Sequence, residues 1–320
     1  MRIKFSNIGV IGLALALGLG GCAQAQTQPT TVVEVVTIVT DNPVGEDEIN
    51  LADFAANQAT HYDGIVEGIG NDLSALAARV AEVYSNPGSY TGSLPLGDEN
   101  ADMIAQFHLP TGIERVGDIA AEEDLLTHVL PEMQQLIADH PEISSVYFGS
   151  ESGILFVYMR PFTVDPEYVP SERPWYEAAV GANGNLVWTH VYVDSFTGGK
   201  VATAAQEVRT TDGTLVGVVG ADITLDAIIQ DLNALQVPET GFAFLTDAYG
   251  DVFADSRFPS GDAFTPDDLD PDLISAMRGG QSGMREINHE NIDFTVGYAP
   301  LSTTGWALGV GVRTDGQGPQ

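Results

Sequence analysis

The chain carries very little positive charge. Its 320 residues include 12 Lys and Arg against 45 Asp and Glu, the formal net charge is −33, and the only lysines are Lys4 and Lys200. Nucleic-acid binding needs clustered Lys and Arg to contact phosphates, so this composition excludes that class of function. The same deficit disfavours electrostatic adsorption to anionic lipid. The excess of acids suits a protein that stays hydrated in salty water, and it equally suits an acidic exported protein.

Cysteine and long apolar runs are also scarce. Cys22 is the only cysteine, which excludes an internal disulfide and a Cys-rich metal cluster. Beyond the N-terminal segment no stretch has 18 consecutive apolar residues, so no later membrane-spanning helix is expected. Hydrophobic residues nevertheless make up 44% of the chain, with 13 Phe, 10 Tyr and 3 Trp. This is enough for ordinary cores and argues against intrinsic disorder.

The N-terminus has the layout of an export signal. A basic start precedes the apolar run 8–19, which is too short for a comfortable membrane span. The tetrapeptide Leu-Gly-Gly-Cys that ends at Cys22 resembles a bacterial lipobox, in which the cysteine is lipidated and becomes the mature N-terminus. We therefore expect a signal peptide at 1–21 and a protein anchored by lipid outside the cytoplasm, on the periplasmic face or cell surface. By resemblance to sorting signals, Ala23 favours the outer membrane if the cell is Gram-negative.

Two helical segments follow a polar tether. Residues 22–45, with the cysteine at their start, are rich in Gln, Thr, Val and Pro and show no helical period. Residues 46–85 predict a long helix, since apolar residues recur there at spacings of three and four. A second helical segment is expected at 122–140, and Pro131 is expected to divide it.

The pattern then changes to short β-rich runs separated by turn residues. Strands are expected at 144–148, 154–159, 186–193, 201–208 and 214–223. A smaller copy of the plan follows, with helices at 224–235 and 267–278 and strands at 241–246, 252–255, 283–287, 292–300 and 306–312. A sheet with helices packed on it, repeated twice, is an α+β architecture.

The stretch 168–222 gathers donors that suit a carboxylate. Arg173 carries a planar guanidinium that can hold a carboxylate through two parallel hydrogen bonds. Tyr168 adds a hydroxyl and Trp175 an indole N–H, while Trp175 and Tyr176 can form walls that exclude water. Taken singly, Arg173 could be a solvated surface residue and the aromatic residues could be plain core.

The same stretch holds acceptors that suit an ammonium group. Asp194 and Asp222 are carboxylates, and Tyr192 can also accept a hydrogen bond. Each aspartate alone could be an ordinary turn or strand-end residue. A pocket with one end for an anion and one end for a cation fits an α-amino acid, so the prediction depends on the whole set.

These residues stand in motifs that resemble the extracellular double-Cache sensor family. The chain reads Arg-Pro-Trp-Tyr at 173–176, Tyr-Val-Asp at 192–194, Thr-Gly-Gly-Lys at 197–200 and Gly-Ala-Asp-Ile at 220–223. The resemblance extends over about 46–312. It implies a long N-terminal helix followed by two PAS-like modules, each an antiparallel sheet flanked by helices.

The resemblance also assigns roles to the two modules. It implies a ligand-binding, membrane-distal module at 46–223, a smaller membrane-proximal module at 224–313 and a polar tail at 314–320. One subset of the family binds amino acids through a fixed constellation, and every member of it is present here. By that resemblance the carboxylate is held by Tyr168, Arg173 and Trp175, the ammonium group is held by Tyr192, Asp194 and Asp222, and Tyr176 helps to shape the site. Residues that select the ligand side chain are expected within 144–164 and near Glu207.

The expected function is therefore binding of a small amino acid outside the cytoplasm, for sensing or capture. Most family members lie between two transmembrane helices ahead of a cytoplasmic kinase, cyclase or chemotaxis domain. Here a lipobox takes the place of the first helix and the chain ends after the second module, so a separate receptor, kinase or transporter partner is expected. The alternatives are an amine or small carboxylate as ligand, and a structural envelope lipoprotein without a ligand.

No pattern indicates catalysis, a cofactor or a metal. The acidic loop 262–272 lacks the glycine and terminal glutamate of a helix-loop-helix calcium site, and the six histidines show no tight ligand spacing. No phosphate loop, dinucleotide fingerprint or nucleophile elbow is present. Scattered Ser, His and Asp give no support to a peptidase or esterase, so we expect no enzyme, no cofactor and no metal.

Overall fold

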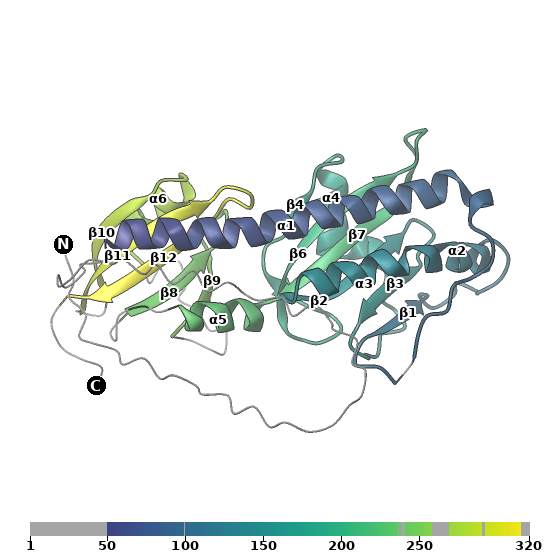
Figure 1. Cartoon of the computed structure of the whole chain (residues 1–320), viewed down its shortest axis with the longest axis horizontal. Coiled ribbons are helices and arrows are strands. Elements are labelled where there is room, and N and C mark those ends of the chain that lie inside the picture. Colours follow the sequence, from purple (N-terminus) through teal and green to yellow (C-terminus); the bar gives the residue numbers. More distant parts are fainter. Residues whose placement is uncertain are drawn as a thin grey trace, which may run out of the picture. The chain divides into compact units, whose positions relative to one another are not determined.

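The computed structural model describes residues 50–98, 100–235, 237, 241–257, 269–289 and 292–314 (Figure 1). The described residues from Leu51 onward form one compact unit. The expected signal peptide, Cys22, the tether and the polar tail lie outside the described residues, apart from Thr314. Among the residues that the structure describes, no helix combines the length and the apolarity that crossing a membrane requires.

Helix α1 (Leu51–Ser85) is common to both halves of the fold. It ends at Ser85 as predicted. It contacts strands β6 (Lys200–Arg209) and β7 (Leu215–Thr224) of one sheet and β11 (Ile292–Leu301) and β12 (Trp306–Arg313) of the other (Figure 1). Its buried residues follow one another at spacings of three and four, which places them on one face of the helix. They include Leu51, Ala55, Ala59, Tyr62, Val66, Ile69, Leu73, Leu76, Val80 and Val83.

The first sheet has seven antiparallel strands in the order β1-β3-β2-β7-β6-β4, and β5 also pairs with β6. The strands are β1 (Ile104–His108), β2 (Ile143–Ser150), β3 (Leu155–Met159), β4 (Val187–Trp188), β5 (Tyr192–Val193), β6 (Lys200–Arg209) and β7 (Leu215–Thr224). Its helices are α2 (Asp118–Leu126), α3 (Leu130–Asp139) and α4 (Pro174–Gly181), and short 3₁₀ turns lie at Pro87–Ser89, Thr127–Val129 and Pro170–Glu172.

The two faces of this sheet carry different helices. Side chains alternate between the faces along each strand. Phe148 of β2 contacts Tyr84 of α1, with ring centroids 5.8 Å apart, and α3 also packs on β2 and β3. The neighbouring Tyr147 lies on the opposite face and contacts Trp175 of α4, with ring centroids 4.8 Å apart. Helix α4 therefore covers the face that α1 does not.

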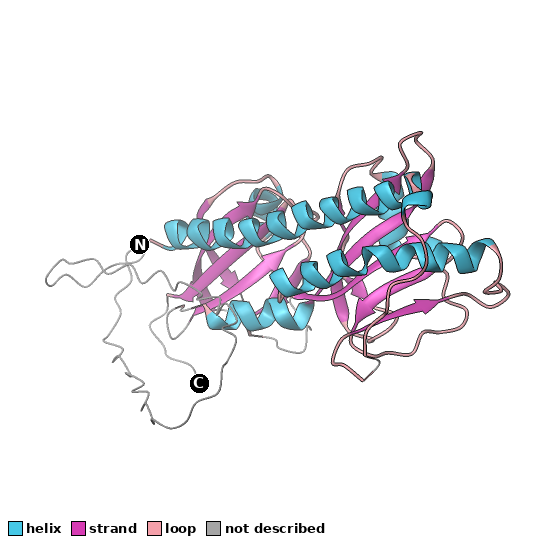
Figure 2. Ribbon diagram, turned by 45° about the vertical axis from the view of Figure 1, so that its right-hand side comes forward, coloured by secondary structure: helices cyan, strands magenta, loops and turns pink. Residues whose placement is uncertain are grey.

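The second sheet is smaller and also antiparallel, with five strands in the order β10-β11-β12-β8-β9. Its strands are β8 (Gly241–Thr246), β9 (Val252–Asp255), β10 (Gly283–His289), β11 (Ile292–Leu301) and β12 (Trp306–Arg313). Helix α5 (Leu225–Ala234) precedes it and α6 (Pro271–Arg278) packs on β11 and β12. The α+β prediction is confirmed: two antiparallel sheets follow a long N-terminal helix, with helices packed against them (Figure 2).

The differences from the predicted elements have local causes. The strand expected at 186–193 is split into β4 and β5, and the segment between them contacts the turn after β8 through His190 and Asp247. Strand β1 and helix α4 were not predicted. Helix α4 begins with Pro174 at its first position, where a missing N–H costs nothing, so the signal for it was present. Helix α6 begins at Pro271 because the Asp270 carboxylate caps it by accepting from the Leu273 N–H at 2.9 Å.

Candidate ligand-binding site

A small cavity opens on the α4 side of the first sheet. It is lined by Tyr147, Tyr168, Arg173, Trp175, Tyr192, Asp194, Ser195, Phe196 and Asp222. The structure thus brings together all the predicted ligand-binding residues except Tyr176. They come from the loop before α4, from α4 itself, from the β5 hairpin and from β7, so only the folded sheet assembles them.

Asp222 forms the floor of this cavity. It is 3% exposed, and its carboxylate accepts hydrogen bonds from Ser145 at 2.9 Å, Tyr147 at 2.7 Å and Thr203 at 2.6 Å. Burial raises the pKa of the Asp222 carboxyl to about 6, against the hydroxyl hydrogen bonds, which lower it, while nearby Asp194 raises it. The site therefore holds a buried carboxyl group that titrates near neutral pH.

A hydroxyl relay leads from Asp222 to Tyr192. The single Thr203 hydroxyl proton is donated to Asp222, so the 2.8 Å contact between Thr203 and Tyr192 must use the Tyr192 proton. Burial raises the pKa of Tyr192, so it remains a neutral phenol. This arrangement leaves the lone pairs of the Tyr192 oxygen available to accept a hydrogen bond from a ligand.

Asp194 also lines the cavity, but its carboxylate organises the loop that follows it. It accepts from the backbone N–H of Phe196 at 3.2 Å and of Thr197 at 2.9 Å, and from the Thr197 hydroxyl at 2.6 Å. Its own N–H donates to the Gly199 carbonyl at 2.8 Å. Asp194 is 7% exposed, so this turn holds a second buried carboxylate at the cavity.

Arg173 supplies the positive charge of the site. It is half-buried, donates through Nη2 to the Ser195 hydroxyl, and its Cζ lies 5.3 Å from the centre of the Tyr168 ring. None of the ion pairs in the described part of the chain includes Arg173 or Asp222. Within the described part of the chain, one cavity therefore contains a guanidinium and a buried carboxyl group that are both outside any ion pair.

Aromatic rings close the sides of the cavity. The Trp175 indole N–H points at the Tyr168 hydroxyl at 3.4 Å, and the Tyr168 ring lies 4.8 Å from that of Phe196. Burial raises the pKa of Tyr168, which keeps its hydroxyl protonated and able to donate. Trp175 fits against the sheet because Gly149 has no side chain, since a Cβ there would lie 2.7 Å from the indole ring. These rings form apolar walls beside the charged groups of the cavity.

Tyr176 and Glu207 lie apart from this cavity. The Tyr176 hydroxyl donates to Glu151, and its ring packs 5.5 Å from that of Trp175, so Tyr176 supports the wall from behind. Glu207 accepts two hydrogen bonds of 2.9 Å from the Arg209 guanidinium. We expected residues near Glu207 to select the ligand side chain. The Glu207 carboxylate is instead paired with Arg209 and does not line the cavity.

Several cavity residues were not predicted by name. Ser195 and Phe196 lie directly beside the predicted Asp194, and Tyr147 falls within the expected segment 144–164. Ser145 and Thr203 contact Asp222 from neighbouring strands. Their contact with Asp222 depends on how β2 and β6 pair with β7, so no local pattern in the sequence identifies them.

A second, somewhat larger cavity lies between α1 and the second sheet. Its lining is mostly apolar and includes Val66, Leu245, Leu301 and Trp306. We assign ligand binding to the smaller cavity because it contains the charges that recognise a polar ligand.

Comparison with solved structures shows the same fold in ligand-binding domains of bacterial receptors. The domain of the Pseudomonas aeruginosa PAO1 amino acid chemoreceptor PctB, in complex with L-Arg, gives a TM-score of 0.54 at 19% identity, covering 82% of this chain and 91% of that chain. The domain of the Pseudomonas fluorescens chemoreceptor CtaA, in complex with L-alanine, gives 0.55 at 19% identity, covering 83% and 96%. At these identities the likeness shows the fold alone.

Sequence comparison finds methyl-accepting chemotaxis proteins. McpA of Pseudomonas putida is 34% identical over 174 residues, which are 53% of this chain and 26% of McpA. McpC of Bacillus subtilis is 28% identical over 186 residues, 58% of this chain and 26% of McpC. The match thus spans about a quarter of the length of these relatives. The dCache_1 model, described as a Cache domain, matches residues 54–316, and the chain therefore belongs to the dCache_1 family of Cache domains.

Proposed function

We propose that this protein binds a small α-amino acid outside the cytoplasm, for sensing or capture. The observation that carries the proposal is the pairing of opposite, unpartnered charges on one small cavity, Arg173 on one side and Asp222 on the other. A zwitterionic ligand would satisfy both. A ligand with only one of its charges would leave the other protein group buried and unpaired, which is costly.

In the proposed complex, Arg173, Tyr168 and Trp175 donate to the ligand carboxylate. At the other end, Asp222, Asp194 and the Tyr192 oxygen accept from the ammonium group. No covalent step is required, because aromatic walls and fixed hydrogen bonds hold the charged groups in place before the ligand arrives. Binding would then favour one arrangement of the pocket, and a partner would detect that shift in population.

The related structures support this ligand class. Solved domains of this fold include complexes with L-Arg and L-alanine, and a third is in complex with GABA. Each of these ligands carries an amino group and a carboxyl group. The similar sequences are chemotaxis proteins, and a further fold neighbour is the extracellular domain of a putative histidine kinase. These relatives favour a sensory role with a membrane partner.

We further propose that Cys22 carries the lipid that anchors the protein. The support is the Leu-Gly-Gly-Cys sequence at the end of an export-like segment. Cells fed a radioactive fatty acid should label the wild-type protein and leave a Cys22→Ser variant unlabelled. Equal labelling of both would contradict the anchor.

The ligand is tested by a thermal-shift screen of the purified protein against amino acids, amines and small carboxylates, at moderate and high salt. A ligand present at 100 times its Kd stabilises the folded state by about 2.7 kcal/mol, which is a visible shift in Tm. Shifts with amino acids but not with simple amines or acids are expected. Shifts with only one of the simple classes would favour the amine or carboxylate alternative, and no shift in any condition would favour a structural role.

A further inference from the structure

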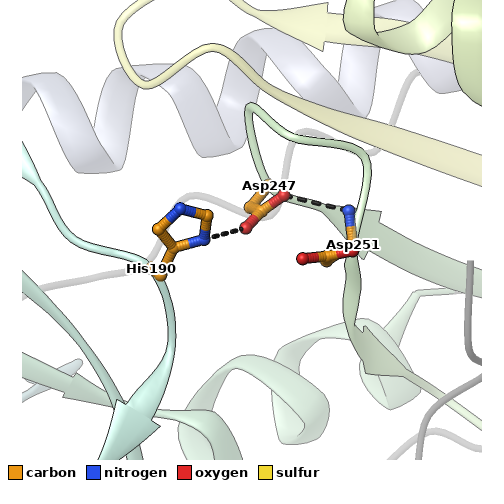
Figure 3. A group of neighbouring side chains, drawn as sticks. All are labelled: His190, Asp247 and Asp251. Atoms are coloured by element: carbon orange, nitrogen blue, oxygen red, sulfur yellow. Dashed lines mark hydrogen bonds and ion pairs between the residues drawn. The ribbon is translucent and has the colours of Figure 1, made fainter.

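Three potential metal ligands converge beside the second sheet. One atom from each of His190, Asp247 and Asp251 lies within 4.8 Å of the others (Figure 3). His190 lies between β4 and β5, whereas Asp247 and Asp251 begin and end the turn between β8 and β9. The group therefore combines an imidazole with two carboxylates from elements that belong to different sheets. No spacing in the sequence predicts it, because His190 and Asp247 are 57 residues apart.

Two of these side chains are already held in position. One Asp247 oxygen accepts from the backbone N–H groups of Tyr249 and Asp251, both at 2.9 Å. This fixes the other oxygen, which lies 2.7 Å from Nδ1 of His190. The imidazole stacks on the Tyr249 ring with centroids 3.8 Å apart and planes 26° apart. Such outer contacts are the kind that orient metal ligands in proteins.

The third side chain, that of Asp251, is not held in this way among the described residues. Asp251 is exposed, and no hydrogen bond to its carboxylate is present in the described part of the chain. Figure 3 shows this carboxylate turned toward the space beside the His190–Asp247 pair. A cation placed there would meet the Asp251 carboxylate without breaking any contact that it makes now.

We propose that His190, Asp247 and Asp251 bind a divalent transition-metal ion such as Zn²⁺. Imidazole nitrogen and carboxylate oxygen together suit such ions, and three protein ligands leave further positions for water. The ion would take the place of the proton on His190 Nδ1. The neutral imidazole would then carry its one proton on Nε2, which leaves the Nδ1 lone pair for the ion. Since the ligands come from two sheets, the bound ion would join the β4–β5 segment to the β8–β9 turn.

The test is calorimetric titration of the purified full-length protein with ZnCl₂, MnCl₂ and CaCl₂ in separate experiments. We expect one Zn²⁺ to bind per chain. Mn²⁺ and Ca²⁺ should each bind more weakly than Zn²⁺. His190→Gln and Asp251→Asn should each weaken Zn²⁺ binding by ~10-fold or more. The matched controls are His61→Gln, an exposed histidine on α1, and Glu167→Gln, an exposed acid, and both should bind Zn²⁺ as the wild type does.

Thermal melts in EDTA show whether each variant is folded, and both altered side chains are exposed, so folding should persist. A second readout is the Tm, which Zn²⁺ should raise in the wild type and the controls but not in His190→Gln. Absence of saturable Zn²⁺ and Mn²⁺ binding up to millimolar concentration would overturn the proposal. Equal binding by the wild type and His190→Gln would overturn it too, since the ion would then occupy other acids.

Discussion

The ring of Tyr147 lies across Gly220, and its hydroxyl donates a 2.7 Å hydrogen bond to the Asp222 carboxylate two residues farther along β7. Tyr147 and Gly220 face each other directly in the sheet, and a Cβ on Gly220 would lie 2.3 Å from the Tyr147 ring. This explains in physical terms why a glycine precedes the aspartate in Gly-Ala-Asp. The glycine provides room for the ring that orients the carboxylate.

Replacing Tyr147 by Phe should weaken the site and the fold together. The Asp222 carboxylate loses one donor, which costs about 1–3 kcal/mol, and its pKa rises further. Urea unfolding at pH 8, where the carboxylate is charged in the wild type, measures the loss. Tyr158→Phe on the adjacent strand is the control, since no hydrogen bond to that hydroxyl is present among the described residues, and it should change stability by less than about 0.5 kcal/mol. Equal losses in both variants would remove the special role of Tyr147.

Adding one methyl group at Gly220 should displace the Tyr147 ring. Because a Cβ there would lie far inside contact distance of a fully buried side chain, Gly220→Ala should destabilise the protein by about 1–3 kcal/mol and weaken ligand binding. Gly64→Ala is the matched control: it lies in helix α1 with open space around its Cβ position, and it should stabilise the protein by about 0.5–1 kcal/mol. A neutral Gly220→Ala would show that the ring adjusts freely.

The titration of Asp222 predicts opposite pH dependences for stability and binding. Its carboxyl in the folded protein holds a proton up to about pH 6, whereas an unfolded one releases it at about pH 4. The folded state therefore binds more protons between these values, so this group makes the free energy of unfolding fall as pH rises through that window. Binding of an ammonium group needs the charged form, so affinity should rise through the same window.

Two measurements check these slopes. Urea unfolding of the wild type and Asp222→Asn at pH 4, 5, 6 and 7, values chosen to span the window, should give a difference that changes between pH 4 and 6. Calorimetry of the identified ligand at pH 5, in buffers of different ionisation enthalpy, should show that binding releases a proton. If the stability difference does not change with pH and binding releases no proton, Asp222 is ionised over the whole pH range measured.

Arg173 should contribute charge and geometry separately. Arg173→Ala should cost about 2–5 kcal/mol of binding free energy, because a ligand carboxylate is left buried and unpaired. Arg173→Lys keeps the charge but loses the planar fork, so its loss should be intermediate. Calorimetry with the ligand found in the screen measures both, and the exposed Arg160→Ala is the control. Binding by Arg173→Ala within about threefold of the wild type, ~0.7 kcal/mol, would reject the assignment.

Most of the helices and strands could be predicted from local periodicity in the sequence. The three-and-four spacing along α1 and the apolar runs of β8 and β9 are short-range signals, and β8 and β9 have the predicted bounds. Helix α4 was missed although Pro174 and Glu177 mark its first turn. Its eight residues are too few to show a clear helical period, and its aromatic residues resemble a strand.

Contacts that depend on strand register could not be predicted from the sequence. Tyr147 and Asp222 are 75 residues apart, and their meeting depends on how β2 aligns with β7. The same holds for the meeting of His190 with Asp247 across two sheets. The motif residues could be named because they resemble a family pattern, whereas Tyr147, Ser145 and Thr203 act on Asp222 through pairing that no local pattern encodes.

The tryptophans beside the β4–β5 segment give the protein built-in optical probes. Trp188 contacts Trp306 of the second sheet at 5.5 Å between ring centroids, and only four residues later Tyr192 lines the cavity. The remaining tryptophan, Trp175, is itself part of the cavity wall. Intrinsic fluorescence thus reports from the cavity and from the contact with the second sheet without any label. A Trp175→Phe variant would silence the cavity signal and leave the emission of the Trp188–Trp306 pair as a direct reading of what reaches the second sheet.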